Sequence, residues 1–319
     1  MPETRLDLAR IRAARRVIDP VFLDSPLYRC EPLEGALGCR VSVKLETANP
    51  VRSFKGRGTE VVVSGLAGRG ERAAVCASAG NLGQALAWSG RRHGLDVTVV
   101  SSPSAPAAKL ERIRALGARL ELVDGDFDLA RARARAVADE RGVRLVEDSL
   151  DVETCEGAAT IGLELADAGP FDAVLIALGG GALATGAGHV VKACLPGTEV
   201  IAVQPSGAPA TTLSWRERRV VTTDSTATIA DGVAARRPIP DVLADLLAVA
   251  DDAVLVREES IIAGMRLFLE RAGLVVEPSA ALGLAAILED PARFAGRHVV
   301  TIVCGGNVDL PAYRRWLGF

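Results

Sequence analysis

Short apolar runs alternate with longer stretches of mixed apolar and polar residues through most of this chain. The short runs predict β-strands at residues 41–46, 73–76, 97–101, 120–123, 143–146, 173–178, 199–204 and 299–303. The longer stretches, among them residues 82–93, 107–116 and 127–140, have the length and spacing of helices. Strands that alternate with helices in this way are typical of parallel βαβ units. The pattern therefore predicts an α/β fold.

The chain of 319 residues is long enough for about two domains. We expect a smaller α/β unit at residues 70–147 inside a larger unit formed by both ends of the chain, 1–69 and 148–319. No repeat or low-complexity linker marks this boundary, and composition alone does not locate it. In open parallel sheets ligands bind beyond the carboxyl ends of the strands, so candidate chemistry is sought in the loops that follow strands.

Charge and cysteine content narrow the class of protein. The 40 acidic and 37 basic residues leave a net charge of −3, which argues against a nucleic-acid or anionic-membrane partner. The longest uncharged run, residues 173–191, contains five glycines and is a poor candidate for a membrane-spanning helix. The start of the chain is charged from its third residue and lacks an apolar signal core. Six scattered cysteines without a C-x-x-C pair predict reduced thiols and a cytoplasmic location.

The loop after the predicted strand at 173–178 carries three consecutive glycines, Gly179, Gly180 and Gly181, before a helical stretch. Consecutive glycines let several N–H groups point at one place, and a helix N-terminus adds positive potential, so the loop is suited to hold a phosphate group. Its spacing matches neither a Walker loop nor a dinucleotide-binding fingerprint. A tight strand-to-helix turn without a ligand is the alternative, and the loop alone does not decide between them.

Lysine is rare in this chain, which has four lysines among its 37 basic residues: Lys44, Lys55, Lys109 and Lys192. Arginine effectively never loses its proton, so a retained lysine can mark a place where an amine is needed. Lys55 lies after a turn, between glycines, with Arg52 and Arg57 as nearby charges that favour a neutral amine. Lys55 is therefore the candidate nucleophile for a Schiff base, and a surface lysine at a helix start is the alternative. We expect the other three lysines to be solvated charges.

Two more glycine-containing turns follow predicted strands. The segment SAGNLG at 78–83 has the composition of a helix N-cap, and the same exposed N–H groups could hold a carboxylate. The segment CGGNVD at 304–309 follows the last predicted strand, and Cys304 taken alone is expected to be a buried, inert thiol. Each segment is a weak signal by itself.

Taken in their order along the chain, these segments resemble the motifs of the pyridoxal-phosphate enzymes that share the tryptophan synthase β-subunit fold, fold type II. Within that family the chain is most similar to the serine/threonine dehydratases. The resemblance spans most of the chain and rests on SFKGRG at 53–58, SAGNLG at 78–83, GGGALATG at 179–186, TIADGVA at 228–234, VEPSAA at 276–281 and CGGNVD at 304–309. It implies two open, twisted, mostly parallel sheets flanked by helices. The larger domain (1–69 and 148–319) would bind the cofactor, and the small domain (70–147) would be mobile.

The resemblance also implies a role for each matching residue. Lys55 would hold pyridoxal 5′-phosphate as a Schiff base and act as the catalytic base, with Phe54 against the cofactor ring. Asn81 would bond the ring hydroxyl, and Cys304 would face the pyridine nitrogen. The phosphate would be bound by Gly179, Gly180, Gly181, Ala182 and Leu183, and the substrate carboxylate by Ser78, Ala79, Gly80, Asn81 and Leu82.

The implied activity is that of a dehydratase, or ammonia-lyase. Such an enzyme eliminates the β-hydroxyl group of serine, threonine or a related β-hydroxy amino acid and gives a 2-oxo acid and ammonia. A β-replacement enzyme, which adds an external nucleophile to an aminoacrylate intermediate, is the alternative on the same scaffold. A non-catalytic cofactor-binding module is a third hypothesis, which the intact Lys55 and glycine loop disfavour.

Departures from the family pattern refine these expectations. Ala79 stands where serine racemases of the family have a serine, which argues against racemisation. Gln204 and Ala210 stand where some relatives have acidic metal ligands, so no metal ion is expected. The expected partner is a small amino-acid substrate, and because dimers are common in the family, a homodimer is an expected state.

Overall fold

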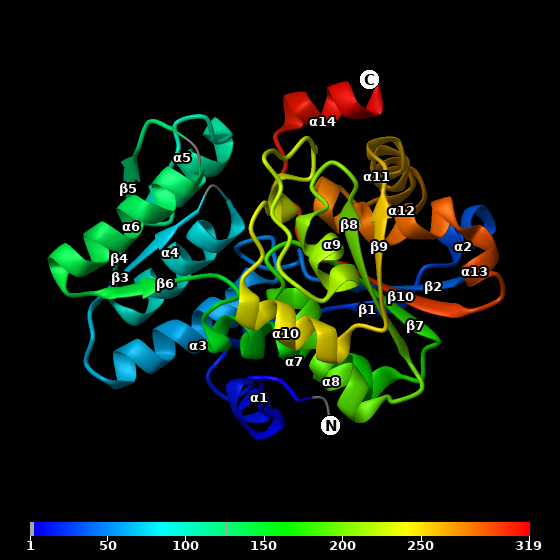
Figure 1. Ribbon diagram of the computed structural model, residues 1–319, viewed down its shortest axis with the longest axis horizontal. Helices are drawn as coiled ribbons and strands as arrows, with labels where there is room; N and C mark the ends of the chain where they lie inside the picture. The colour runs from blue at the N-terminus through cyan, green and yellow to red at the C-terminus, as the bar shows by residue number, and fades with distance from the viewer. Residues whose placement is uncertain (1–2, 79, 126) are drawn as a thin grey trace.

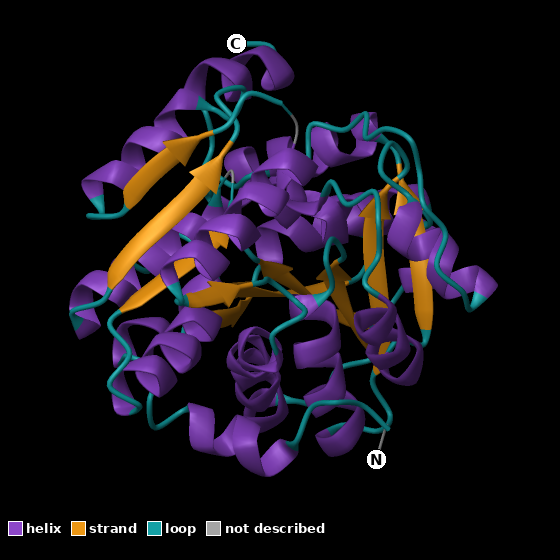
Figure 2. Cartoon of the chain, turned by 60° about the vertical axis from the view of Figure 1, so that its left-hand side comes forward, coloured by secondary structure: helices purple, strands orange, loops and turns teal. Residues whose placement is uncertain are grey.

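The computed structural model describes residues 3–78, 80–125 and 127–319, which form two sheets with helices on both faces (Figures 1 and 2). All strand pairings in these residues are parallel except that of β1 with β2. The larger sheet has the order β1 (Leu27–Arg29), β2 (Arg40–Leu45), β10 (His298–Val303), β7 (Ala173–Ala177), β8 (Glu199–Pro205), β9 (Asp252–Val256). The smaller has the order β5 (Arg119–Leu122), β4 (Asp96–Ser101), β3 (Ala73–Ala77), β6 (Arg144–Val146). The predicted α/β class is confirmed.

The eight predicted strands correspond to β2 to β8 and β10, with ends that agree to within one residue. The prediction missed the two edge strands of the larger sheet. β1 is short and mostly exposed, so it has no apolar run to reveal it. β9 follows the apolar helix α10 (Pro240–Val249) so closely that the two merge into one apolar stretch of the sequence.

Helices cover both faces of the larger sheet, whose central strands are therefore buried on both sides, as the continuous apolar run of β7 requires. Helices α7 (Val152–Ala168), α8 (Ala182–Cys194) and α10 lie on one face, and α1 (Leu8–Ala14) packs against α7. Helices α2 (Glu31–Leu37), α11 (Glu258–Ala272) and α12 (Leu282–Glu289) lie on the other. The shorter helices α9 (Ala210–Glu217), α13 (Pro291–Phe294) and α14 (Leu310–Leu317) complete the larger lobe.

The smaller sheet has its own two apolar layers. Ala74 and Cys76 of β3 pack into the layer with α4 (Asn81–His93) and α5 (Ala107–Ala115), while Val75 belongs to the layer with α6 (Phe127–Arg141). This alternation follows from the period of two along a strand. The core of the smaller sheet is thus built from residues of its own lobe together with one face of α3 (Lys55–Gly68).

Helix α3 connects the two lobes and is held close to α7. A Cβ atom at Gly58 would lie 2.8 Å from the carbonyl oxygen of Thr154, and one at Gly157 would lie 2.4 Å from Gly58 Cα. Only glycine fits at these two positions, because the helix backbones touch there. The contact fixes the first turn of α3, which carries Lys55, against the larger lobe.

Two further findings concern the cysteines and the apolar character of the helices. All six cysteines are free thiols, and all but Cys194 are buried. Within the part of the chain that the structure describes, no helix has the length and apolar character that crossing a membrane requires.

Candidate active site

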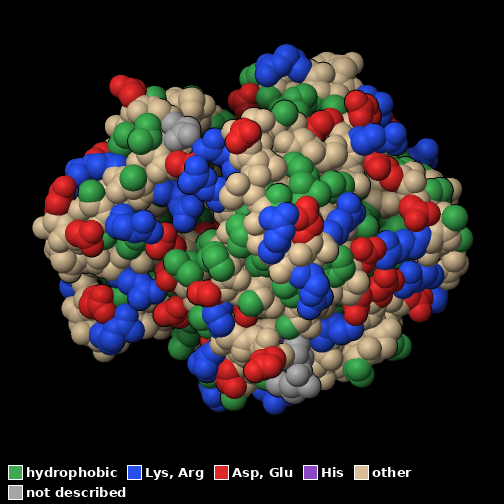
Figure 3. Space-filling model, in the orientation of Figure 1, with side chains coloured by type: hydrophobic (Ala, Val, Ile, Leu, Met, Phe, Trp, Pro, Cys, Tyr) green, Lys and Arg blue, Asp and Glu red, His purple; other side chains and the backbone are tan. Residues whose placement is uncertain are grey.

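Four loops that follow parallel strands meet between the two sheets (Figure 2). The loops after β3 and β6 come from the smaller sheet, and those after β7 and β10 come from the larger. Two hydrogen bonds join them: Ala182 N–H donates to Ser149 Oγ at 3.0 Å, and Asn307 Nδ2 donates to Asn81 Oδ1 at 2.8 Å. Figure 3 shows a furrow where the lobes meet, with Lys and Arg side chains gathered along it. The carboxyl ends of parallel strands are where such folds bind ligands.

Lys55 is the first residue of α3 and lies at this junction. Its Nζ is 2.5 Å from Asp148 Oδ2 and 4.6 Å from the centre of the Phe54 ring. The Phe54 N–H donates to the carbonyl oxygen of Cys304 at 3.1 Å, which holds the start of α3 against the end of β10. The Lys55 side chain is only 16% exposed. Phe54, Lys55 and Cys304, which the sequence placed in one site, are brought together.

The triple-glycine loop is tightly enclosed at the N-terminus of α8. A Cβ atom at Gly179 would lie 2.8 Å from Val233 Cα, and one at Gly181 would lie 2.4 Å from Val242 Cγ1. Gly181 also has a φ of +112°, a backbone conformation that residues other than glycine rarely adopt. These positions are therefore restricted to glycine by the surroundings and the backbone conformation of the loop.

The donors of this loop are only partly used. The Ala182 N–H is bound by Ser149 Oγ, and a Cβ atom at Gly180 would come within 2.8 Å of the same oxygen. Among the described residues, the Leu183 N–H has no hydrogen-bond partner and is buried. Buried backbone donors are nearly always satisfied, so the end of α8 is suited to an anionic ligand. Phosphate has this chemistry.

Cys304 is buried at the end of β10. Burial strongly raises the pKa of its thiol, and the nearby carboxylate of Glu277 raises it further. The thiol is therefore neutral at physiological pH. It can donate or accept a weak hydrogen bond, but it cannot act as an anion that keeps a neighbouring group protonated.

The loop that the sequence assigns to the substrate carboxylate is partly closed on itself. Ser78 Oγ accepts hydrogen bonds from the N–H groups of Gly80 at 3.1 Å and Gly83 at 2.9 Å, and the Ser78 N–H donates to Val100 O. Ala79 lies outside the described residues. Among the described residues of the loop, the N–H groups of Asn81 and Leu82 at the start of α4 are the ones without a partner.

Asn81 joins the two lobes through a buried carboxylate. Its Nδ2 donates to the two oxygens of Glu277 at 2.9 and 3.1 Å, and its Oδ1 accepts from Asn307. Ser279 Oγ also donates to Glu277, at 2.8 Å. Burial raises the pKa of Glu277, since its nearest donors are neutral amide and hydroxyl groups. The second lone pair of Asn81 Oδ1 remains available to a ligand hydroxyl.

Lys109 corrects an expectation from the sequence, because it is not a solvated charge. It is 8% exposed, and its Nζ is 2.5 Å from Asp231 Oδ2. A Cβ atom at Gly80 would lie 3.6 Å from this Nζ, so the ammonium group adjoins the predicted carboxylate loop. Lys109 belongs to α5 of the smaller lobe and Asp231 to the larger lobe, so the pair also bridges the junction.

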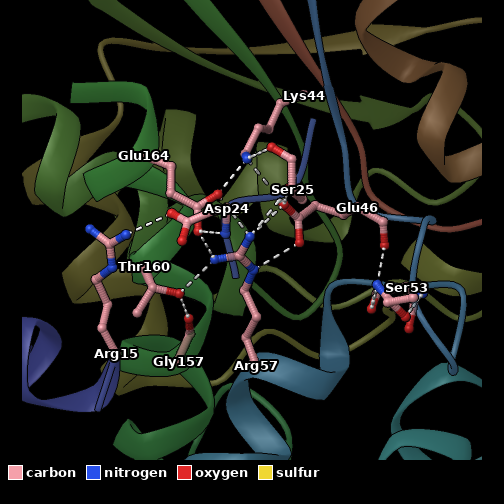
Figure 4. Close-up of polar contacts among 11 residues, drawn as sticks. Arg15, Asp24, Ser25, Lys44, Glu46, Ser53, Arg57, Gly157, Thr160 and Glu164 are labelled. Atoms are coloured by element: carbon pink, nitrogen blue, oxygen red, sulfur yellow. Dashed lines mark hydrogen bonds and ion pairs between the residues drawn. The ribbon is translucent and has the colours of Figure 1, made fainter. Parts of the chain in front are cut away.

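Lys44 is likewise buried, at 1% exposure, and forms an ion pair with Glu164. Figure 4 shows both residues beside the guanidinium group of Arg57, which is fully buried between Glu46 and Glu164. The charge of Arg57 is therefore neutralised by these carboxylates, which corrects the expectation that it acts on the amine of Lys55. Lys192, at 24% side-chain exposure, pairs with Asp251 near the end of α8.

Several polar residues of the site were not assigned from the sequence. Asp231 and Glu277 lie inside two of the quoted motifs, TIADGVA and VEPSAA, so a signal for them was present. Asp148 lies two residues after the end of β6, and the rule that ligands bind after parallel strands could have found it. Lys109 carried the signal of lysine rarity, but its burial depends on a partner far away in the sequence.

Comparison with known proteins identifies the class to which this site belongs. The family model described as "Pyridoxal-phosphate dependent enzyme" matches residues 18–305. The chain is 31% identical to an L-threonine ammonia-lyase of Thermotoga maritima over 96% of this chain and 76% of that protein. It is 30% identical to an L-threo-3-hydroxyaspartate ammonia-lyase of a Pseudomonas species over 95% of both chains. A structure of maize serine racemase superposes with a TM-score of 0.91 at 28% identity, covering 97% of this chain and 96% of that one.

The chain belongs to the pyridoxal-phosphate-dependent enzymes. Its cofactor is pyridoxal 5′-phosphate, and it is a pyridoxal-phosphate-dependent lyase of the dehydratase type, which confirms the resemblance drawn from its motifs. The described residues fit this cofactor. The amine of Lys55, the apolar ring of Phe54 and the N-terminus of α8, where the Leu183 N–H has no partner among the described residues, lie at one junction.

Proposed function

We propose that this enzyme eliminates the β-hydroxyl group of serine, threonine or a related β-hydroxy amino acid and releases a 2-oxo acid and ammonia. The observation that carries the proposal is the meeting of Lys55, the triple-glycine loop and the loop of Asn81 at the junction of the two sheets. By their names, two relatives that match along at least 95% of this chain also release ammonia from β-hydroxy amino acids.

In this proposal Lys55 anchors the cofactor and then serves as the base that takes the α-proton of the substrate. Pyridoxal phosphate, when bound, supplies the sink for the electron pair left at the α-carbon. Positioned proton transfer of this kind contributes about 10²- to 10⁴-fold to the rate. Low exposure of the Lys55 side chain supports the role, because few waters can compete for its proton.

The other predicted residues would bind and orient. The N–H groups of Asn81 and Leu82, with the ammonium of Lys109 beside them, are suited to a substrate carboxylate. Residues 179–183 would hold the cofactor phosphate at the start of α8, and Phe54 would pack against the cofactor ring.

Cys304 would face the nitrogen of the cofactor ring with a neutral thiol. Since its pKa is raised by burial, it would not hold a proton on that nitrogen as a carboxylate would. Weaker charge stabilisation favours prompt loss of the β-substituent over the longer-lived charge that racemisation or transamination needs. Together with Ala79, which stands where serine racemases of the family have a serine, this favours elimination over racemisation in this chain.

We also propose that residues 70–147 form a small mobile domain that closes on a large domain of residues 1–69 and 148–319. Three polar contacts across the junction support this idea: Lys109 with Asp231, Asp128 with Arg236, and the Arg112 guanidinium with the carbonyl of Pro50. These polar contacts exchange with water at lower cost than the apolar contact of α3 with the smaller sheet, about which the small domain would turn. Hydrogen exchange with and without an amino-acid ligand would detect closure.

Location and assembly are part of the same proposal. The six free cysteines support a reducing, cytoplasmic environment. A homodimer is proposed from the habits of the family, and light scattering on the purified holoenzyme would measure its mass directly.

The test is a screen of D- and L-β-hydroxy amino acids for 2-oxo acid formation by the holoenzyme, with Lys55→Ala as the inactive control. We expect 2-oxo acid and ammonia from at least one isomer without any added nucleophile. A strict requirement for an added thiol or other nucleophile would establish β-replacement instead. If the purified protein showed no cofactor absorbance and formed no covalent adduct after borohydride reduction, the proposal that Lys55 holds the cofactor as a Schiff base would be rejected.

A further inference from the structure

Asp148 is a carboxylate in contact with the reactive amine, and no motif of the sequence explains it. Its Oδ2 is 2.5 Å from Lys55 Nζ. Its other oxygen, Oδ1, is buried and has no hydrogen-bond partner within the described residues. The Asp148 side chain as a whole is 31% exposed, so it opens onto the junction, where a polar group of a ligand can satisfy Oδ1.

The loop around Asp148 is fixed by its neighbours on both sides. The Glu147 N–H donates to Asp151 Oδ2 at 2.9 Å. Ser149 is buried with φ of +66°, and its hydroxyl accepts from the Ala182 N–H. A non-glycine residue held at positive φ marks a conformation that the surroundings enforce, often at a functional site. The structure therefore holds the carboxylate of Asp148 at the junction.

The position of Lys55 sets where the substrate must lie. Reacting atoms approach to about 3–3.5 Å, so the α-carbon of a substrate whose proton Lys55 removes lies within about 6 Å of the Asp148 carboxylate. To accept that proton Lys55 has to be neutral, and it then does not cancel the charge of Asp148. Lys109, the other lysine beside the site, is already paired with Asp231.

We propose that Asp148 is a specificity-determining residue that selects the substituent on the β-carbon of the substrate. A hydroxyl or ammonium group there can donate a hydrogen bond to the free Oδ1, whereas a carboxylate on the β-carbon is repelled by the like charge. The enzyme thus takes amino acids with neutral or cationic β-substituents and discriminates against those with an acidic group. This inference rests on the proposed function, whose substrate class it narrows.

The experiment measures kcat/KM of the holoenzyme for L-serine, L-2,3-diaminopropionate and L-threo-3-hydroxyaspartate, in the wild type and in Asp148→Asn. Serine loses water and, after hydrolysis, gives pyruvate and one ammonia. Diaminopropionate loses its β-amino group as ammonia and, with one water, gives pyruvate and two ammonia. Hydroxyaspartate gives oxaloacetate and one ammonia. We expect the wild type to use hydroxyaspartate at least about tenfold less efficiently than serine, and Asp148→Asn to narrow this ratio by about tenfold or more.

Glu147→Gln is the matched control. It removes the same charge from the neighbouring residue, whose carboxylate is turned toward Arg135 at 3.0 Å and Arg131 at 3.5 Å in the smaller lobe. This variant should leave the substrate ratio within about twofold of the wild type, because surface pairs of this kind contribute little.

Binding supplies a readout that does not depend on turnover. L-Alanine and L-aspartate carry no β-leaving group, so their dissociation constants can be measured by calorimetry. We expect Asp148→Asn to tighten L-aspartate binding relative to L-alanine. Should Asp148→Asn fail to fold, Asp148→Ser is tested in the same way.

The outcomes separate the two proposals. If none of the amino acids yields a 2-oxo acid, the proposed function fails. If serine is turned over but the serine-to-hydroxyaspartate ratio is equal in the wild type and Asp148→Asn, only the role of Asp148 is rejected. A wild type that prefers hydroxyaspartate to serine rejects that role too.

Discussion

Lys55 and Arg57 stand two residues apart on the first turn of α3, yet their surroundings are opposite. All three nitrogen atoms of the Arg57 guanidinium are hydrogen-bonded, to the two buried carboxylates and two hydroxyl groups around it (Figure 4). Within the residues that the structure describes, Lys55 Nζ has a single hydrogen-bond partner, Asp148. A cation whose hydrogen-bond donors are all used stabilises the fold, whereas a cation with unused donors can also bind a ligand and react.

The carboxylates of the two regions differ in the same way. Although burial alone raises the pKa of Glu164, hydrogen bonds from Arg57 and Lys44 and their charges outweigh it and hold this pKa below its usual value. Burial raises the pKa of Glu277 at the junction, and the charge of Lys109 with the hydrogen bonds from Asn81 and Ser279 does not outweigh it. The first region therefore favours the ionised form of its carboxylate and the second disfavours it.

Exchanging the two cations for apolar residues should separate activity from stability completely. We expect Lys55→Ala to lower kcat/KM by at least about 10³-fold, because it removes both the proposed base and the cofactor anchor. Compared without cofactor, its urea midpoint should remain close to that of the wild type, since within the described residues Lys55 leaves one ion-pair partner, Asp148, unpaired. Steady-state kinetics with urea unfolding measures both. A Lys55→Ala protein that keeps turnover would show that the amine is not the base.

The converse variant, Arg57→Met, should lose stability first. It leaves Glu46 and Glu164 buried without their shared cation, and breaking a buried ion pair in this way costs about 3–5 kcal/mol. Arg57→Lys keeps the charge but not the planar fork, so its loss should be intermediate. Both are measured by urea unfolding. An unfolding free energy equal to that of the wild type in Arg57→Met would contradict the idea that this cluster holds α3 to α7.

A smaller effect on activity is expected from replacing Lys109, a buried cation that is proposed to bind the substrate carboxylate. Lys109→Met removes the ammonium beside the predicted carboxylate loop, and we expect KM for the amino-acid substrate to rise about tenfold while kcat changes less. Lys192→Met is the control, because that lysine pairs with Asp251 outside the junction and should leave both constants unchanged. Equal effects of the two variants would remove Lys109 from the site.

Features that depend on a short segment of the chain could be predicted from the sequence. Buried parallel strands are continuous apolar runs, so β7 and β8 could be located almost to the residue. Lys55 could be singled out because lysine is rare and because glycines flank it. The glycine loop could be assigned because its spacing and its place after a strand are both properties of a short segment.

The failures came from contacts between distant segments. Lys44 alternates with apolar residues on β2, which predicts a solvent-facing side chain, but the face it shares is covered by α7 and holds Glu164. Asp148 stands in a loop with Glu147 and Asp151, and three carboxylates in five residues have the pattern of a solvated turn. Only the fold brings the amine of Lys55 against one of them.

The smallest expected effect is in the pH dependence of stability, and it distinguishes the two regions by sign. A carboxylate whose folded pKa is lowered contributes stability that is present above its unfolded pKa, near 4.5, and is lost as pH falls through the folded value. Glu164→Gln should therefore flatten the acid side of the stability curve measured by urea unfolding of the holoenzyme between about pH 3 and pH 7.

Glu277 is expected to act in the opposite direction. Because its pKa is raised in the folded state, Glu277 contributes stability below its unfolded pKa, and this contribution is lost as pH rises through its folded pKa. The stability of Glu277→Gln relative to the wild type should therefore increase toward neutral pH. Glu31→Gln, at an exposed carboxylate, is the control that should follow the wild-type curve. If Glu164→Gln and Glu277→Gln changed the pH dependence of stability in the same direction, the difference between the Arg57 cluster and the junction would not extend to their carboxylates. Opposite changes in the pH dependence of stability would show that Glu277, like Lys55, has too few charged partners at the junction to stabilise its ionised form.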